Sequence, residues 1–345
     1  MTVIKGYSPI LTQAAGKFLL EQNSLDVLNV IPTYPVSTKT GLVNKENVAE
    51  LRRLSLTTEE FNEPIKARQQ DLLDFSYRLR PYTSAGDLNL SDAVANGFLM
   101  GGMSPEELEI QIARQHSILV AQKMLNAMCS VFFAAGNHTA TAAPDWSNTA
   151  TSKPIDNVLS YNEAVMRNSG YKPNTAIMTR SVYSKLRLND QIRSEFGGGF
   201  VGDSNGIIAP LNEQRLATAL EVDRVLVINT TYNAADLGVS PQTGTFLGGG
   251  NFFMLGYFDP NSISGGVFQN GLGAGFYMPT AQISGNRIDS GYSNGLNVPL
   301  PVPIEVRKTY DGDLKGGGVD RIICEANVAY NVVYSEFGHL STVTV

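Results

Sequence analysis

The chain has 345 residues and a net charge of −6, with 26 Lys and Arg against 32 Asp and Glu. This length exceeds the size at which single hydrophobic cores stop growing, so we expect two subdomains or a core with extensions. The basic residues form no cluster, which argues against tight sequence-independent binding of nucleic acid, since such binding needs many contacts from Lys and Arg to phosphates. Only 17% of the residues are charged, against about 25% in a typical soluble domain, which suggests that much of the surface contacts other protein.

The first part of the chain predicts an arm and then a long excursion. Residues 1–29 are polar and weakly patterned, and we expect them to be ordered only by packing on something else. Residues 27–43 are predicted to be extended, and Pro32 and Pro35 restrict that segment to an exposed sheet edge. Residues 72–82 alternate between apolar and polar side chains, which predicts a half-buried strand. A lone hairpin of this kind buries too little apolar surface to be stable in water, so it needs a neighbour to lie on.

A long helix is predicted over residues 104–134. Ser104 and Glu107 have the spacing of a capping box, and Pro105 occupies the first helical position, where its missing N–H costs nothing. No Gly or Pro follows before Gly136, so the helix is about 30 residues and roughly 45 Å long. In residues 118–133 apolar side chains point in nearly every direction, and this predicts a half that is buried all round.

Neither a membrane span nor a disulfide is expected. The apolar half of the helix is short for a bilayer crossing and is interrupted by Lys123. The N-terminus shows no secretory signal pattern. Cys129 and Cys324 are the only cysteines, each lies in an apolar segment, and we expect two free, buried thiols in a reducing compartment.

The second half of the chain alternates between predicted helices and strands. Residues 137–150 are small and polar and are expected to form a loop. The elements then follow as a helix over 154–166, a strand over 175–179, a helix over 181–188, a Gly-rich loop over 197–206, a helix over 211–220 and strands over 224–229 and 252–259. Such an order predicts an α/β or α+β unit. Residues 261–300 are rich in Gly, Ser and Asn and predict no element, whereas 302–308 and 321–334 are expected to pair as antiparallel strands.

The sequence contains only weak motifs for ligand binding. Gly197, Gly199 and Gly202 have the spacing of a dinucleotide-binding loop, with Glu221 and Asp223 about twenty residues further on. That motif binds phosphate only between a strand and a helix, where backbone N–H groups point at the ligand. Here it follows a predicted helix and leads into more loop, so it argues only weakly for nucleotide binding.

The three histidines give no metal site. His116, His138 and His339 have no partner at the spacing of a metal ligand, and His116, in the middle of the long helix, is expected to be a polar packing residue. The sequence contains no nucleophile elbow. We therefore expect no catalytic residue, no cofactor, no metal and no enzymatic activity.

The order of segments resembles the major capsid proteins of tailed bacteriophages, the fold family named for the phage Hong Kong 97. The resemblance depends on Asp145-Trp146-Ser147, Lys153-Pro154-Ile155-Asp156, Ser169 to Met178, Val182 to Ile192, Leu216-Ala217, Glu221 to Val227, Thr231 to Ala235 and Val306 to Phe337. Each motif is degenerate, but their order is specific and covers nearly the whole chain. Residues 261–300 have no clear counterpart in the family.

The resemblance implies an α+β fold of the Hong Kong 97 type. Its parts would be an N-terminal arm at 1–29, an extended β-hairpin loop at 30–84, a peripheral domain at 85–150 and 301–345 containing the spine helix, and an axial α/β domain at 151–300. The implied function is that of a major capsid protein, which self-assembles into the icosahedral head shell enclosing the double-stranded DNA genome of the phage. The alternative that we keep open is an α/β protein that binds a nucleotide or another small molecule through the Gly-rich loop 197–206.

The resemblance also implies partners and a location. The chain would bind copies of itself in pentamers and hexamers, a separate scaffolding protein, a portal and, as a further candidate, a decoration protein, while packaged DNA would be contacted weakly and without specificity. No membrane is involved. The location would be the virion capsid, assembled in the cytoplasm of the host bacterium.

Assembly contacts are expected in the loop and in the last strand. The candidates are Lys39, Lys45, Arg52, Arg53, Phe61, Lys66, Asn327 and Asn331. Some members of the family cross-link a Lys of the extended loop to an Asn of the peripheral domain. For this chain we expect instead solvated lysines and asparagines at a sheet edge, as exposed polar side chains usually are.

Overall fold

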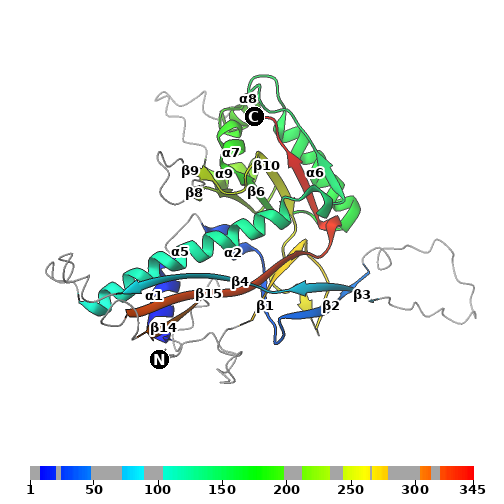
Figure 1. Ribbon diagram of the computed structural model, residues 1–345. Coiled ribbons are helices and arrows are strands. Elements are labelled where there is room, and N and C mark those ends of the chain that lie inside the picture. Colours follow the sequence, from blue (N-terminus) through cyan, green and yellow to red (C-terminus); the bar gives the residue numbers. More distant parts are fainter. Residues whose placement is uncertain are drawn as a thin grey trace, which may run out of the picture.

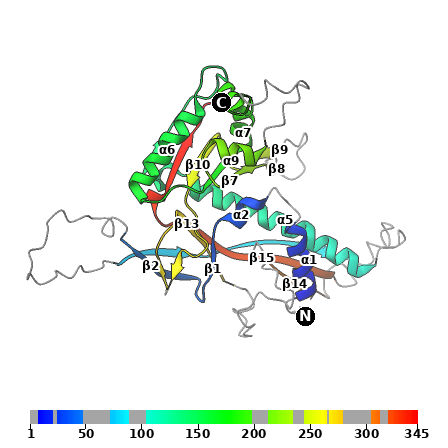
Figure 2. The same ribbon diagram turned by 180° about the vertical axis from the view of Figure 1, so that it is seen from behind.

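The computed structural model describes residues 8–20, 25–47, 72–88, 104–197, 212–233, 244–264, 266–278, 304–311 and 319–345. One long helix, α5 (Pro105–Phe132), lies between two layers of structure. A long sheet runs beneath it, and a compact domain of helices around a second sheet stands above its C-terminal end (Figure 1). The opposite view shows the short helices α1 and α2 beside α5 (Figure 2).

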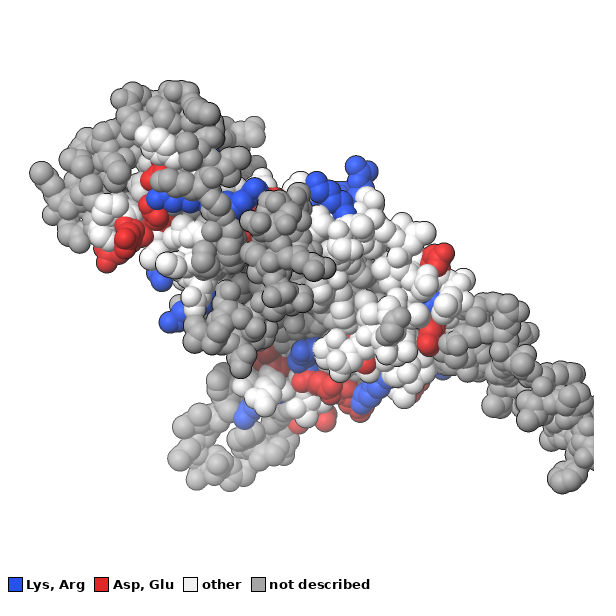
Figure 3. Space-filling model, turned by 90° about the horizontal axis from the view of Figure 1, so that it is seen from below, with Lys and Arg blue, Asp and Glu red and all other residues white. Residues whose placement is uncertain are grey.

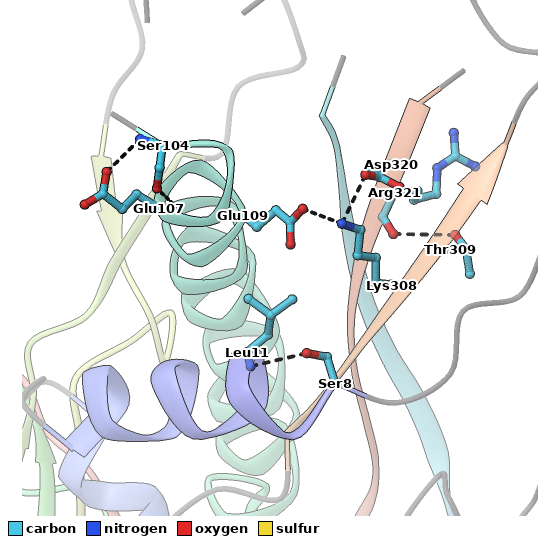
Figure 4. Close-up of polar contacts among 9 residues, drawn as sticks. All are labelled: Ser8, Leu11, Ser104, Glu107, Glu109, Lys308, Thr309, Asp320 and Arg321. Atoms are coloured by element: carbon cyan, nitrogen blue, oxygen red, sulfur yellow. Dashed lines mark hydrogen bonds and ion pairs between the residues drawn. The ribbon is translucent and has the colours of Figure 1, made fainter. Parts of the chain in front are cut away.

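Helix α5 begins as the sequence predicts. The hydroxyl of Ser104 accepts a hydrogen bond from the backbone N–H of Glu107 at 3.2 Å, and the carboxylate of Glu107 accepts one from the backbone N–H of Ser104 at 2.7 Å (Figure 4). The expectation that the second half is buried all round is wrong. An exposed stripe runs along it at positions three and four apart, formed by Leu119, Lys123, Asn126 and Ser130. The helix therefore packs on two layers and leaves one face open.

The long sheet is built around β15 (Val319–Val332). On one side β15 pairs antiparallel with β4 (Arg80–Leu88). It also pairs antiparallel with β14 (Glu305–Asp311) along its first half and with β13 (Gly273–Tyr277) along its second half. The predicted pairing of the two C-terminal strands is confirmed, as is the edge position of the proline-containing segment, because β1 (Thr33–Pro35) ends the strand order beside β13.

Helix α5 packs closely on this sheet. A Cβ atom at Gly86 of β4 would lie 2.6 Å from Cγ2 of Ile112, so this contact requires glycine. One turn further along, Nδ1 of His116 lies 2.8 Å from the hydroxyl of Ser84. The interpretation of His116 as a polar packing residue is thus confirmed, and its partner is a strand that lies about thirty residues earlier in the sequence.

The compact domain has a five-stranded sheet of order β5–β16–β10–β6–β7. These strands are Ala140–Ala142, Gly338–Thr342, Phe252–Gly256, Thr175–Thr179 and Arg224–Ile228. Its helices are α6 (Pro154–Ser169), α7 (Arg180–Leu186), α8 (Asp190–Gly197) and α9 (Glu213–Ala219). All the elements predicted between 154 and 256 are present, and α8 is an additional helix. Helix α6 ends at Gly170, whose φ of 79° is the left-handed conformation that glycine adopts freely.

The two sheets do not divide at residue 300. Strand β13, within the expected axial range 151–300, belongs to the long sheet, and β16, within the expected peripheral range 301–345, belongs to the compact sheet. The chain therefore crosses between the two layers more often than the sequence indicated, and part of the unassigned Gly-rich segment supplies a strand to the long sheet.

The hairpin excursion is present as β2 (Thr40–Glu46) and β3 (Leu72–Arg78), which pair antiparallel. It does not stand alone, because β2 also pairs with β12 (Val267–Phe268) and β12 with β11 (Ile263–Ser264). A separate ribbon of β8 (Thr231–Asn233) and β9 (Gly244–Phe246) lies beside the compact domain.

The N-terminal arm differs from the expectation. Residues 9–20 form helix α1 and residues 26–30 form helix α2, and the predicted extended conformation at 27–30 is wrong. Leu11, Ala15 and Leu19 are spaced by four and are buried in the main core, so the arm is ordered by packing on its own chain. Ser8-Pro9 before this stripe is the start signal that sequence reasoning missed.

The arm also closes the outer edge of β14. The backbone N–H of Ser8 donates to the carbonyl of Val306 at 3.0 Å, and the N–H of Val306 donates to the buried hydroxyl of Thr12 at 2.9 Å. Both backbone groups of Val306 that point away from the sheet are thereby satisfied.

Other expectations can be compared with the described part of the chain. Cys129 and Cys324 are free and buried, as predicted. Among the described residues no helix is long and apolar enough to cross a membrane. The same residues contain no group of three or more His, Cys, Asp or Glu side chains that could hold a metal ion.

Candidate assembly surface

The stem of the hairpin is fixed to the body by aromatic rings. Phe75 of β3 lies 6.2 Å from Phe268 and 5.7 Å from Phe276 between ring centroids, and the ring of Tyr77 stacks on Phe276 at 5.1 Å. Each such pair contributes about 0.5–1.5 kcal/mol beyond the burial of area. The stem is thus a rigid base, and the neighbour that the hairpin was expected to need is, for these two strands, part of the same chain.

Lys45 strengthens the same attachment. Its ammonium donates to the carbonyl of Val333 at 2.8 Å and lies 5.1 Å from the ring centroid of Tyr334. The hydroxyl of Tyr334 lies 2.8 Å from the carbonyl of Glu46. Burial is the main cause that raises the pKa of Tyr334 well above its ordinary value, so its hydroxyl remains a donor at neutral pH.

The stem also carries exposed apolar side chains. Leu42 is 70% exposed, Leu72 48% and Leu73 45%. Strand β3 is also the last strand of its sheet in the described part of the chain. An exposed strand with apolar side chains is a template for binding another chain, and native proteins keep one only where a partner covers it.

Ion pairs join the strands of the long sheet to each other and to α5. Lys308 of β14 bonds the carboxylates of Glu109 on α5 and Asp320 on β15, the latter at 3.0 Å (Figure 4). Burial lowers the pKa of Lys308, but its bonds to the two carboxylates outweigh that effect and leave the pKa raised. Lys308 therefore carries its positive charge throughout the physiological range and joins the start of the helix to the sheet.

Two further ion pairs lie on the other face of the same strands. Arg307 pairs with Glu325, and the guanidinium of Arg321 pairs with Asp87 at 2.6 Å. Seen from below, acidic and basic side chains alternate along this part of the molecule (Figure 3). A mixture of both signs favours specific contact with a complementary protein surface over binding to a polyanion.

A groove lies between α5 and the β8–β9 ribbon. It has a volume of about 260 Å³ and is lined by Asn126, Cys129, Ser130, Phe133, Tyr232, Gly248, Gly249 and Phe252. Exposed rings lie on the ribbon, with Tyr232 41% and Phe246 47% exposed. Cys129 is buried within it, and burial raises the pKa of its thiol to about 12, so it remains an unreactive thiol.

The predicted contact residues fall into different environments. Lys39 is exposed, while Lys45 is held by its own chain and is not a solvated lysine. Asn327 is buried, with its amide donating to Glu325 at 3.1 Å, on the strand inside the long sheet and not at an edge. The amide of Asn331 donates to the carbonyl of Ser76 on β3 at 2.8 Å.

Four candidates lie outside the described residues, namely Arg52, Arg53, Phe61 and Lys66. The Gly-rich loop 197–206 of the alternative hypothesis also lies outside the described residues from residue 198 onward. Nothing in the described part of the chain favours nucleotide binding. Sequence reasoning missed the exposed Leu42, Leu72 and Leu73. The Leu72-Leu73 doublet, which breaks the period of two, is the signal that could have identified them.

Comparison with known proteins identifies the fold. No protein-family model matches the sequence, and no curated protein matches it. Among solved structures, a phage-related protein from Bordetella bronchiseptica superposes with a TM-score of 0.62 at 14% identity, covering 99% of this chain and 97% of the other. The virus-like particle from Pyrococcus furiosus gives a TM-score of 0.50 at 8% identity over 95% of this chain and 98% of that one.

A third similar structure is the capsid of cyanophage P-SCSP1u, with a TM-score of 0.50 at 8% identity, covering 91% of this chain and 86% of the other. These three matches extend over most of the length of each chain. The chain therefore has the α+β capsid fold of the Hong Kong 97 type that the sequence resemblance implied.

Proposed function

We propose that this chain is a major capsid protein, a structural subunit without catalytic activity that assembles into the icosahedral head of a tailed phage around double-stranded DNA. The observation that carries the proposal is the end-to-end match to the virus-like particle protein, which leaves no large part of either chain without a counterpart. The location would be the virion capsid, and assembly would take place in the cytoplasm of the host bacterium.

The surfaces described above support a self-assembling subunit. The stem of β2 and β3 is held to the body by Phe75, Tyr77 and Lys45, and its exposed leucines would be covered by a partner. In a closed shell each exposed strand is covered by an adjacent copy, and many modest contacts add to a large total stability. We infer that the stem and the segment beyond it lie on the neighbouring copy.

In this proposal each layer of the fold has its own role in assembly. The compact domain, with β6, β7 and β10, would meet its copies around the local five- and sixfold axes. The long sheet and α5 would form the wall between these axes. A separate scaffolding protein, a portal and, as a further candidate, a decoration protein would complete the particle, and the net negative charge suits a container that holds DNA without binding it tightly.

A covalent cross-link of the kind that some members of the family form is disfavoured for Lys45, because its ammonium already bonds the carbonyl of Val333. The remaining loop lysines would be solvated or would contact a neighbour without a covalent bond. Denaturing gels of assembled particles test this directly: we expect monomers alone, and a ladder of multimers would show that a cross-link forms.

A loop replacement tests the assembly role. Residues 47–71 are replaced by Asn-Gly, which can join Glu46 to Leu72 as a two-residue hairpin because these residues are already a cross-strand pair. We expect the variant to fold, with unchanged hydrogen-exchange protection in β15 and the compact domain, and to form no shells. The matched control carries a Gly-Ser segment of equal length at 48–71. Shells of normal size from the Asn-Gly variant would refute the role given to this loop.

A further inference from the structure

Two of the connections between the long sheet and the compact sheet lie side by side. One runs from α5 through the 3₁₀ turn Ala135–Asn137 into β5, and the other from β15 through the 3₁₀ turn Ser335–Phe337 into β16. The N–H of Thr139 donates to the carbonyl of Ser335 at 3.2 Å, and β5 and β16 then pair in parallel. In Figure 1 the second connection is the red chain that rises from the long sheet to the compact domain. These two connections, residues 133–142 and 333–342, form a junction between the two layers.

Each connection carries one buried histidine. His138 is 7% exposed, and its Nε2–H donates to the carbonyl of Phe132 in the last turn of α5 at 2.6 Å. The other nitrogen, Nδ1, is buried and has no hydrogen-bond partner in the described part of the chain. It lies against Gly338, where a Cβ atom would be 3.1 Å away. A proton on Nδ1 would therefore be a buried donor with nothing to accept it.

His339 lies directly after Gly338 and is 3% exposed. Its ring stacks on Tyr161 of α6 with centroids 3.9 Å apart, and its Nδ1 lies 3.4 Å from the hydroxyl of Ser341. Ser341 and Asn157 in turn bond the hydroxyl of Tyr161. The groups that face the pair are thus a backbone carbonyl from α5, a neutral phenol from α6 and a hydroxyl from β16, and none of them offers a negative charge.

We propose that His138 and His339 make this junction acid-sensitive: neutral rings hold the two layers at the angle seen here, and protonation of the pair loosens the junction. A proton on either ring places a positive charge in a buried site without a carboxylate, and a second proton adds repulsion between two imidazolium rings. Opening the junction to water relieves both costs. The inference concerns the single chain and does not depend on the assembly role.

The electrostatics agree with this geometry. Burial first, and the proximity of His138 second, lower the pKa of His339 to about 4. Burial also lowers the pKa of His138, although its bond to the carbonyl of Phe132 opposes the shift. Because both pKa values lie below the value of about 6.5 for an exposed histidine, the opened junction binds protons more tightly. The closed junction is thus fully stable above about pH 6.5 and loses stability as the pH falls toward about 4.

Hydrogen exchange of the full-length chain between pH 7 and pH 4.5, corrected for the intrinsic pH dependence, tests the proposal. We expect protection to fall at residues 133–142 and 333–342, while the centre of β15 at 320–328 remains protected. His339→Phe retains the ring stack and His138→Gln retains a donor for the carbonyl of Phe132, so each variant should weaken the acid response and the double variant should lose most of it. The control is His116→Gln, which removes the only other histidine and should respond as the wild type does.

The wild type supplies a second readout if a variant fails to fold. With three histidines, the protons on the imidazole Cε1 atoms give three signals, and that of His116 is assigned by its substitution. We expect the other two to titrate below the value of about 6.5 for an exposed histidine, together with the loss of protection at the junction. Titration of both near pH 6.5 with the junction closed would overturn the proposal, and so would an acid response that persists in the double variant.

Discussion

Lys308 offers the sharpest test of how the long helix is held on the sheet. Its side chain is 20% exposed, and the two carboxylates that it bonds, Glu109 and Asp320, are 16% and 17% exposed. Lys308→Met keeps most of the aliphatic stem but leaves two nearby carboxylates without their cation. Breaking a buried pair by removing one partner costs about 3–5 kcal/mol. Since these groups keep some contact with water, we expect a loss of about 3 kcal/mol in the free energy of unfolding, measured by urea denaturation at pH 7.

Two controls separate charge from packing. Lys172→Met removes the cation of an exposed pair with Glu221, whose side chains are 48% and 56% exposed, and should change stability by less than about 0.5 kcal/mol. Adding Glu109→Gln and Asp320→Asn to Lys308→Met removes the two charges that Lys308 paired and should restore most of the loss. The sign of the pH dependence follows from the raised pKa of Lys308: its contribution is complete below about pH 10.5 and is lost as the pH rises through the folded-state pKa. A Lys308→Met variant as stable as the wild type would refute this reasoning.

Further predictions concern close contacts, the arm and the thiols. Gly86→Ala forces a Cβ atom into α5 and should lower the free energy of unfolding, measured by thermal denaturation, by about 1–3 kcal/mol. The control Gly136→Ala meets no atom within 4 Å and should leave stability nearly unchanged. Equal losses of stability in the two variants would contradict the contact between Gly86 and α5. Thr12→Val leaves the buried N–H of Val306 in β14 without its acceptor and should lower the free energy of unfolding by about 1–3 kcal/mol. Thr12→Ser keeps the hydroxyl and should be close to the wild type in stability. A Thr12→Val chain as stable as the wild type would mean that the arm does not close the edge of β14. Cys129 and Cys324, whose pKa values burial raises to about 12, should react with thiol reagents only after unfolding, and fast labelling of the native chain at pH 7.5 would show that either site opens.

Local sequence patterns predicted those helices and strands whose boundaries depend on residues close together in the sequence. The capping box at Ser104, the buried run 175–179 and the antiparallel pair at 302–334 were all correct, because caps, continuous burial and period-two patterns are local properties. The overall fold was predicted on other grounds, because the order of several degenerate motifs resembles that of a known family.

What could not be predicted depends on contacts between distant segments. The arm looked polar because Leu11, Ala15 and Leu19 are spread over a helix whose other faces are solvated, and only their burial against α5 reveals their role. Strand β13 is rich in glycine and has no strand pattern, yet it pairs with β15 along five residues. Lys45 resembled a solvated lysine, because the carbonyl of Val333 that binds it lies about 290 residues away in the sequence.

The most direct measurement is electron microscopy of the full-length chain expressed alone and together with a candidate scaffolding protein. Closed, hollow particles of uniform size, or five- and sixfold rings of subunits, are the predicted result, with density from the β2–β3 stem lying on the adjacent copy. A chain that stays monomeric at high concentration in both preparations, with the exposed leucines of the stem open to solvent, would contradict the proposed function.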